Sequence, residues 1–381
     1  MATIEMVSGD SEYRQPDAES KAFHCSKCGG EMTFAAAEQL MRCGHCGHTE
    51  SVPQGEGHQI IVEYDLEHGL AASRARGYGT PVRTTQCQEC GASVSFPEGV
   101  TATACAFCGS AQVLDQGSSR KVLRPESLVP FAVARDDASS KFSSWLGGLW
   151  FRPSALKHKA RVTEMSGVYV PYWVFDATVH SDWRAQAGYY YYVTETYTER
   201  DSDGDVVEKT RQVRHTRWEP AWGSRTDHFD DLLICASRGL PEKLADKLRT
   251  FNTAALVPYQ PSYLAGWTAE EYAVELNDGW RQAVRRMEAT QDSRCAADVP
   301  GDTHRFLNVS NRFYDETFKH ILLPVWISAY RYKDKVYRFL VNGQTGEVTG
   351  KAPLSAFKII LLVVFIAAII GVIVFLTQRD D

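Results

Sequence analysis

Cysteine spacing constrains this chain more than any other feature of its sequence. Eight of its ten cysteines fall into four Cys-x-x-Cys pairs within the first 108 residues. The pairs form two quartets, with 14 residues between the pairs of each, and the members are Cys25, Cys28, Cys43 and Cys46, then Cys87, Cys90, Cys105 and Cys108. This is the spacing of a zinc ribbon, in which two tight turns place four thiolates around one ion. The sequence therefore predicts two structural Zn²⁺ ions, in ribbons at 21–52 and 87–116.

Glycines support this interpretation, because each pair is followed by one, at Gly29, Gly47, Gly91 and Gly109. The turn after the second thiolate needs a positive φ, which glycine adopts without steric cost. Disulfides and an iron–sulfur cluster are the alternatives, and the paired spacing without a signal peptide favours zinc. A four-thiolate site leaves no position for water, so it stabilises a fold and does not hydrolyse a substrate. We expect the neighbouring His45 and His48 to support the thiolates or face solvent.

The second strong feature is the apolar run Ile359–Leu376, which has 18 residues without a charge. As a helix it would extend about 27 Å, close to the roughly 30 Å hydrocarbon core of a bilayer. A buried core helix is the alternative, but this run is apolar on every side and near the end of the chain. We therefore expect one transmembrane tail anchor in 354–381, which contacts the lipid bilayer through residues 359–376.

Charges beside this run indicate its orientation. Lys351 and Lys358 precede it, whereas Arg379 after it is followed by two aspartates. Positively charged flanks favour the cytoplasmic side. The first residues lack the basic and apolar regions of a signal peptide. We expect a single-pass protein of the cell membrane with its body in the cytoplasm.

The remaining sequence predicts an α+β fold with a β-rich body at 117–353. We expect disorder at 1–20, and a linker at 53–86 that holds a strand at Ile60–Tyr64 and a short helix capped by Asp65. Two hairpins are predicted in the body, one from Tyr189–Thr198 with Val206–Trp218, the other from Tyr330–Val341 with Glu347–Thr349. Helices are predicted at Pro241–Phe251 and Thr268–Thr290, the second from a capping box of Thr268 and Glu271.

The body also contains two similar pairs of short motifs. Leu128-Val129-Pro130-Phe131 resembles Leu256-Val257-Pro258-Tyr259, and Val170-Pro171-Tyr172-Trp173-Val174 resembles Leu323-Pro324-Val325-Trp326-Ile327. Their order is the same in both halves. This pattern suggests that the body arose by duplication of one α+β unit.

Composition and motifs argue against two classes of function. Motifs for a phosphate-binding loop, a zinc protease and a serine hydrolase are absent from the sequence, and we predict no catalytic residues. The isolated Cys235 and Cys295 are expected to be buried apolar residues. The formal net charge is −6, and two tetrathiolate zinc sites lower it to about −10. Broad nucleic-acid binding usually needs a basic face, so protein partners are favoured. A nucleic-acid-binding protein tethered to the membrane, and an enzyme with an unrecognised site in the body, remain alternatives.

Together these motifs resemble one bacterial family. The matching segments are the two ribbons, Glu63-Tyr64-Asp65-Leu66, Leu128–Phe131, Val168–Asp176, Val257–Tyr259, Val341–Gly346 and the apolar C-terminal helix. They look like the double-zinc-ribbon membrane proteins that are encoded near phage-shock-protein-A-like and SPFH-domain proteins, and that are often labelled primosomal protein N′, replication-restart helicase or TFIIB-type zinc ribbon protein. The resemblance implies a membrane adaptor for envelope stress or membrane remodelling, with those proteins as cytoplasmic partners. This sequence lacks every nucleotide-binding motif of a helicase.

Overall fold

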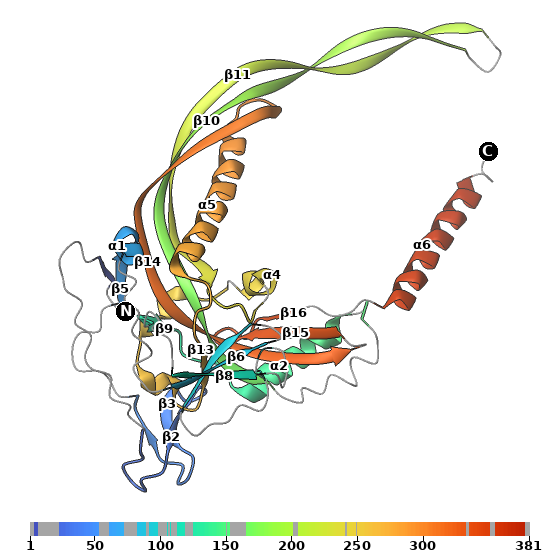
Figure 1. Cartoon of the computed structure of the whole chain (residues 1–381). Coiled ribbons are helices and arrows are strands. Elements are labelled where there is room, and N and C mark those ends of the chain that lie inside the picture. The colour runs from blue at the N-terminus through green and yellow to red at the C-terminus, as the bar shows by residue number, and fades with distance from the viewer. Residues whose placement is uncertain are drawn as a thin grey trace.

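Three very long strands dominate the architecture: β10 (Ser166–Arg200), β11 (Val206–Cys235) and β14 (Thr303–Tyr332) (Figure 1). They contain 35, 30 and 30 residues, whereas strands of globular proteins usually have about 3–10. β10 lies in the middle and pairs antiparallel with both of the others. The three strands bend together into an arch that rises from a broad base.

The computed structural model describes residues 4–6, 23–52, 61–71, 82–88, 91–97, 105, 107, 113–118, 125–149, 151–152, 165–200, 205–240, 242–248, 250–332, 335–350 and 355–377. In this part of the chain a 13-stranded sheet includes the arch and most of the base. The fold is α+β and β-rich, as predicted. Its shorter elements outside the ribbons are β1 (Ile4–Met6), β5 (Ile61–Asp65), α1 (Leu66–Ala71), β9 (Ser127–Leu128), α2 (Arg135–Gly148), α4 (Glu242–Ala245), β12 (Val257–Pro258), β13 (Thr268–Glu270), α5 (Leu276–Asp298), β15 (Lys335–Asn342), β16 (Val348–Gly350) and α6 (Ala356–Thr377), with single 3₁₀ turns at Asp246–Leu248, Thr253–Ala255 and Pro261–Leu264.

The base is buried on both faces of the sheet, which explains the continuous apolar run at the start of β10. Side chains alternate between the faces of a strand. Tyr169 and Trp173 enter a core that also contains α2, while Val170 and Tyr172 enter a second core on the opposite face. These two cores fix the direction in which the arch leaves the base.

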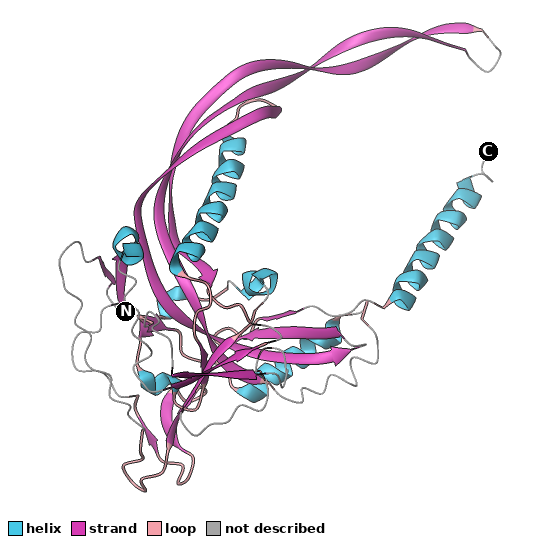
Figure 2. Ribbon diagram, in the orientation of Figure 1, coloured by secondary structure: helices cyan, strands magenta, loops and turns pink. Residues whose placement is uncertain are grey.

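Helix α5 packs against the inner side of the arch (Figure 2). It buries Ala283, Met287 and Cys295, at helical spacing, against β10 and its neighbours. The predicted helix at Thr268–Thr290 was therefore wrong at its start. Thr268–Glu270 form strand β13, which lies between β10 and β7 (Ser93–Pro97), because pairing on both sides outweighs a local capping pattern.

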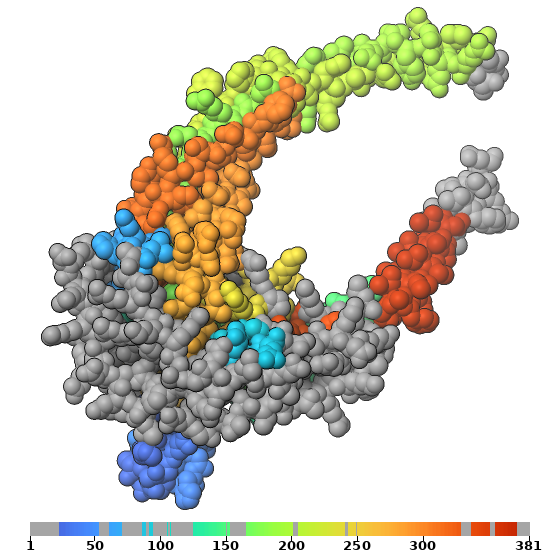
Figure 3. Space-filling view, in the orientation of Figure 1, coloured from blue at the N-terminus to red at the C-terminus, as the bar shows by residue number. Residues whose placement is uncertain are grey.

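Beyond Gly188 the arch consists of β10 and β11 alone. We call this two-stranded part, residues 189–200 with 206–217, the arm; it confirms the hairpin predicted at Tyr189–Trp218. Many of its side chains are exposed, among them Tyr191, Tyr192 and Val193. In the space-filling view the arm stands clear of the rest of the molecule (Figure 3).

The repeated motifs lie side by side. Val170 pairs with Leu323 across β10 and β14, and Leu128 pairs with Val257 across β9 and β12. The two tryptophans make equivalent bonds: the Trp173 indole N–H donates to the Val274 carbonyl, just before α5, and the Trp326 indole N–H donates to the Val133 carbonyl, just before α2. This arrangement is compatible with a duplicated unit.

Other sequence predictions have mixed outcomes. The strand predicted at Ile60–Tyr64 is present as β5, and the helix capped by Asp65 is present as α1, with the His68 amide donating to the Asp65 carboxylate at 2.9 Å; Ile60 lies outside the described residues. Ile4–Met6, within the range expected to be disordered, form a strand parallel to β5, and the rest of 1–20 lies outside the described residues. The second predicted hairpin is present as β15 and β16, but Tyr330–Tyr332 belong to β14. Helix Pro241–Phe251 is shortened to α4 and one 3₁₀ turn.

Helix α6 leaves the base and ends at Thr377 (Figure 1). Its described large apolar side chains, from Phe357 to Ile370, are exposed. Among the residues that the structure describes, no helix meets the length and hydropathy required of a transmembrane segment.

Candidate metal centre

The first cysteine quartet sits in a small three-stranded sheet of β2 (Met32–Ala35), β3 (Leu40–Cys43) and β4 (Thr49–Glu50). Each Cys-x-x-Cys pair forms a tight turn. Gly29 N–H donates to the Cys25 carbonyl at 2.9 Å, and Gly47 N–H donates to the Cys43 carbonyl at 3.0 Å. Gly29 and Gly47 have φ of 71° and 69°, which confirms the predicted need for glycine after each pair.

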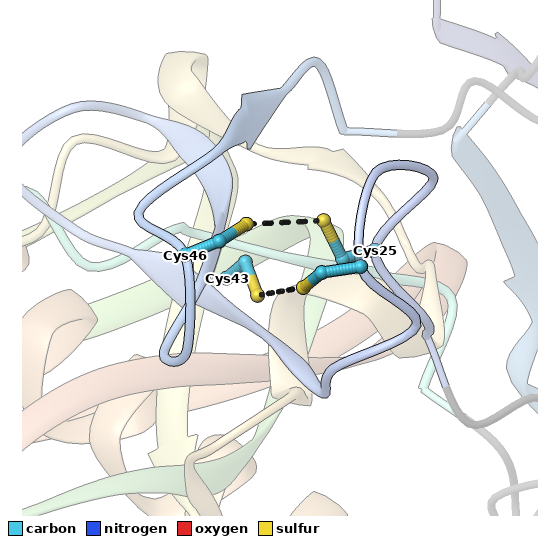
Figure 4. A group of neighbouring side chains, drawn as sticks. Cys25, Cys43 and Cys46 are labelled. Atoms are coloured by element: carbon cyan, nitrogen blue, oxygen red, sulfur yellow. Dashed lines mark hydrogen bonds between the residues drawn. The ribbon is translucent and has the colours of Figure 1, made fainter.

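The two turns bring all four sulfur atoms together (Figure 4). Sγ of Cys25 lies 3.6 Å from that of Cys46, and Sγ of Cys28 lies 3.5 Å from that of Cys43. All four sulfurs lie within 4.8 Å of one another. Tetrahedral zinc with bonds of about 2.3 Å separates its sulfurs by about 3.8 Å. The quartet therefore has the donor atoms and the size to hold one zinc ion, as the spacing predicted.

Acidity differs strongly among these thiols. The N–H of Cys46 lowers the pKa of Cys43 to about 6. The N–H of Gly30 also acts to lower the pKa of Cys28, but the neighbouring thiols of Cys46 and Cys43 outweigh it and raise that pKa to about 12. Four thiolates cannot gather without a cation between them, and a divalent metal provides that charge.

Close packing around the sulfurs explains a further glycine. A Cβ added at Gly30 would lie 3.2 Å from Sγ of Cys43 and 3.3 Å from Sγ of Cys28. Glu50 on β4 stabilises the first turn, because its carboxylate accepts hydrogen bonds from the Ser26 hydroxyl at 2.6 Å and from the Ser26 amide at 3.2 Å. His48 lies 3.4 Å from the same carboxylate and not among the sulfurs, which agrees with a supporting role.

The first ribbon is docked firmly on the base. Its β2 strand donates from the Phe34 amide to the Ala265 carbonyl at 3.0 Å, and the Trp267 indole N–H donates to the Phe34 carbonyl at 2.9 Å. Gln39 reaches the Phe131 carbonyl at 2.6 Å. Cys28 and Cys46 are exposed at the opposite end. In Figure 1 the ribbon projects from the base, so its metal end faces solvent while β2 holds it in place.

The second quartet is only partly described. Cys87 and Cys105 are buried, whereas Cys90, Cys108 and Gly109 lie outside the described residues. One four-cysteine group is therefore evident in the described chain, not two. Strands β6 (Val82–Cys87), β7 and β8 (Val113–Ser118) surround this region, and β7 pairs with β13.

Backbone geometry at Cys87 nevertheless repeats that at Cys25. Cys25 N–H donates to the Gly30 carbonyl at 2.8 Å, and Cys87 N–H donates to the Ala92 carbonyl at 2.9 Å. In both turns the glycine after the pair donates its N–H back to the carbonyl of the first cysteine at 2.9 Å. Gly91 has a φ of 75°. Phe107 N–H donates to Sγ of Cys105 at 3.4 Å, the kind of bond that stabilises a thiolate.

A buried ionic cluster was not foreseen from the sequence. Nζ of Lys319 lies 2.6 Å from the Glu63 carboxylate and 2.7 Å from that of Asp231. Asp176 accepts the Asp231 amide at 2.6 Å and the Thr317 hydroxyl at 3.1 Å. Asp176, Asp230 and Asp231 place carboxylate oxygens close enough for a cation, and Lys319 already supplies a positive charge there. The one sequence signal for this cluster was Lys319 itself, a lysine beside the apolar run of β14.

The isolated cysteines are not exposed nucleophiles. Burial raises the pKa of Cys235 to about 12, and burial also raises the pKa of Cys295, which packs beside Trp183. Thiols with raised pKa values react slowly at neutral pH. Cys295 is buried as expected, whereas Cys235 is only partly buried and packs against the second core.

Comparison with known proteins gives one distant relative. The chain is 27% identical over 345 residues to the Bacillus subtilis (strain 168) protein named uncharacterized protein YdjG, and the alignment covers 89% of this chain and 92% of YdjG. No family model and no solved structure matches the chain. Since the similarity extends along most of both sequences, the two proteins are distant homologues over nearly their full lengths.

Proposed function

We propose that this protein is a non-enzymatic membrane adaptor, whose zinc ribbons recruit cytoplasmic proteins to the bilayer. The observation that carries the proposal is the docked first ribbon. Its inner strand is bonded to the base, while Cys28 and Cys46 at the metal end are exposed. A closed thiolate site performs no hydrolysis, but it makes a small domain rigid enough to present a fixed binding surface.

Zinc is the metal we assign to both quartets. For the first, four sulfurs within 4.8 Å provide the donor set. For the second, the support is the turn at Cys87, which repeats the turn at Cys25, and the amide that faces Cys105. Cys90 and Cys108 complete the proposed site by their spacing in the sequence.

Anchoring is assigned to the apolar run Ile359–Leu376. Support comes from its uncharged sequence and from the described side chains of α6, such as Leu361 and Phe365, which are exposed by 58% and 60%. A surface of this kind is stable in lipid and unfavourable in water. The flanking Lys351 and Lys358 support an orientation with the body on the cytoplasmic side of the cell membrane.

Alkaline extraction of membranes tests the anchor. The full chain should stay in the membrane pellet, and a Leu362→Asp/Ile366→Asp variant should be released, because each aspartate in the middle of a span costs about 3 kcal/mol. Leu70→Asp is the matched control: Leu70 on α1 is exposed by 40%, almost the same as Leu362 at 39%, and its variant should remain in the pellet. Release of the unmodified chain would refute the anchor.

Partner recruitment is tested by affinity purification of the tagged full chain from solubilised membranes. By resemblance, we expect phage-shock-protein-A-like and SPFH-domain proteins among the partners. Recovery should fall for Cys28→Ser and stay unchanged for Cys295→Ser, which alters a buried thiol away from the ribbons. Recovery of DNA or RNA without a protein partner would contradict the adaptor and favour a tethered nucleic-acid-binding protein.

A further inference from the structure

We propose that the arm joins two copies of this chain, through antiparallel pairing of the open edge of β10 between Tyr190 and Thr198 with the same edge of a second copy. This inference goes beyond the adaptor function, because it depends on neither zinc nor the membrane. It rests on the backbone of the arm, on the contrast between this edge and the neighbouring edges, and on the order of side chains along the strand.

The open edge begins where β14 ends its pairing with β10. Thr303 is opposite Gly188, and the Asp302 amide donates to the Gly188 carbonyl at 2.8 Å. Asp302 also accepts the Tyr190 amide at 2.7 Å through its carboxylate. In an antiparallel ladder alternate residues direct both backbone groups to the same side. The even-numbered residues from Tyr192 to Thr198 therefore direct N–H and C=O groups to this edge, where no strand of the described chain pairs with them.

Neighbouring edges carry features that discourage pairing. β14 has residues with positive φ at Phe306 (54°) and Asp315 (52°), each at a shift of register with β10. Such bulges bend an edge away from new strands. β11 contains Pro220, and by the same alternation its missing N–H lies on the outer side. The outer half of β11 is also strongly basic, with Lys209, Arg211, Arg214 and Arg217.

The open edge of β10 has none of these features. Residues Tyr189–Glu199 include no proline and no lysine, and their register with β11 is unbroken from Ala177 to Arg200. Tyrosine, threonine and valine, which favour strands, make up most of the segment. A long regular edge of this composition is a template for strand addition.

A second copy fits this template by its own sequence. Pairing centred on Thr194 places Thr194 opposite itself, Tyr191 opposite Tyr197, and Val193 opposite Glu195. No like charges then face each other, and the aromatic and threonine pairs are favourable. Glu195 and Glu199 already bind Arg211 and Lys209 of their own β11 at 3.2 and 2.9 Å. Pairing of β11 with itself would instead oppose its basic residues. Because a two-fold contact uses the same edge on both copies, it leaves no free edge for a third copy and limits assembly to a dimer.

Disulfide formation tests the register. Thr194→Cys would place two thiols opposite each other with Cα atoms about 5.5 Å apart, within the range for a disulfide. Under mild oxidation of the full-length, zinc-loaded chain, this variant should give a covalent dimer on a non-reducing gel. Thr210→Cys is the matched control, since Thr210 is exposed on β11 opposite Thr196 and should give none. Equal cross-linking of both variants, or of neither, would overturn the proposed pairing.

Proline substitution tests the same contact without a covalent bond. Thr194→Pro and Thr210→Pro each remove one outward-facing N–H and leave the ladder between β10 and β11 intact. Light scattering of the full chain in detergent should give twice the monomer mass for the unmodified protein and for Thr210→Pro, and the monomer mass for Thr194→Pro. Circular dichroism checks that each variant is folded. If Thr194→Pro does not fold, the disulfide experiment alone tests the proposed pairing. A monomeric unmodified chain, equal masses for both variants, or binding of the arm only to another protein or to lipid would refute the dimer.

Discussion

Lys319 and Glu63 form a buried ion pair that links β14 to β5, with Nζ 2.6 Å from the carboxylate and 2% of the lysine side chain exposed. Burial by itself lowers the pKa of Lys319, but its bonds to Asp231 and Glu63 outweigh that effect and raise it above the ordinary value. The lysine therefore stays charged, and it neutralises the partly buried carboxylates of Glu63 and Asp231.

Lys319→Met should destabilise the fold by about 3 kcal/mol, the lower end for a buried pair, because the partly buried carboxylates of Glu63 and Asp231 would be left without a cation. Thermal unfolding of the full chain measures the loss. Lys209→Met is the control: the Lys209–Glu199 pair on the arm is about half exposed, so its loss should cost at most about 1 kcal/mol. Equal shifts in unfolding temperature for the two variants would show that the buried cluster contributes no more stability than an exposed ion pair.

Asp176 should make stability depend on pH in an unusual direction. Burial raises its pKa to about 6 from 3.8, despite the attraction of Lys319. Between pH 4 and 6 the folded state therefore holds a proton that the unfolded state has lost, so the contribution of this group to stability falls as pH rises through that window. Above pH 6 the contribution of Asp176 to the free energy of unfolding stays at its lower value.

Asp176→Asn isolates this effect. Relative to the variant, the unmodified protein should lose up to about 3 kcal/mol of stability between pH 4 and pH 7, a figure that follows from two pKa units. Unfolding of both proteins across the range gives the difference, in which other groups cancel. A difference that does not change with pH, or one that changes in the opposite direction, would contradict a raised pKa at Asp176.

Sequence patterns predicted the local parts of this fold well. Cysteine spacing and the glycines after each pair define the first ribbon, and alternation with a Gly-containing loop defines the arm. These signals are local, so distant residues do not alter them. The lengths of β10 and β14 were missed because Pro171, Gly188 and Pro324 look like breaks, yet the strands continue through them. The Lys319 cluster was missed because its residues come from four separate strands, which only the folded chain brings together.

Trp267 should control how the first ribbon is attached. It stacks on Phe131 with ring centroids 4.0 Å apart and donates its indole N–H to the Phe34 carbonyl on β2. Trp267→Phe keeps an aromatic ring but loses that bond, at a cost of about 1 kcal/mol. Amide exchange at Phe34, whose N–H donates to Ala265, should accelerate roughly fivefold, while exchange at Val170 in the base should not change. Unchanged exchange at Phe34 would mean that the ribbon is held by other contacts.

Metal analysis can separate the two proposed zinc sites. The unmodified chain should contain two zinc ions, and Cys46→Ser and Cys108→Ser should each lower this to one, because a zinc site with three thiolates binds far more weakly. Cys295→Ser should keep both ions, since Cys295 is buried against Trp183 and distant in the fold from either quartet. A chain that contains one zinc ion, lost in Cys46→Ser and kept in Cys108→Ser, would confine the metal to the first ribbon, and the second would then depend on its pairing with β13 alone.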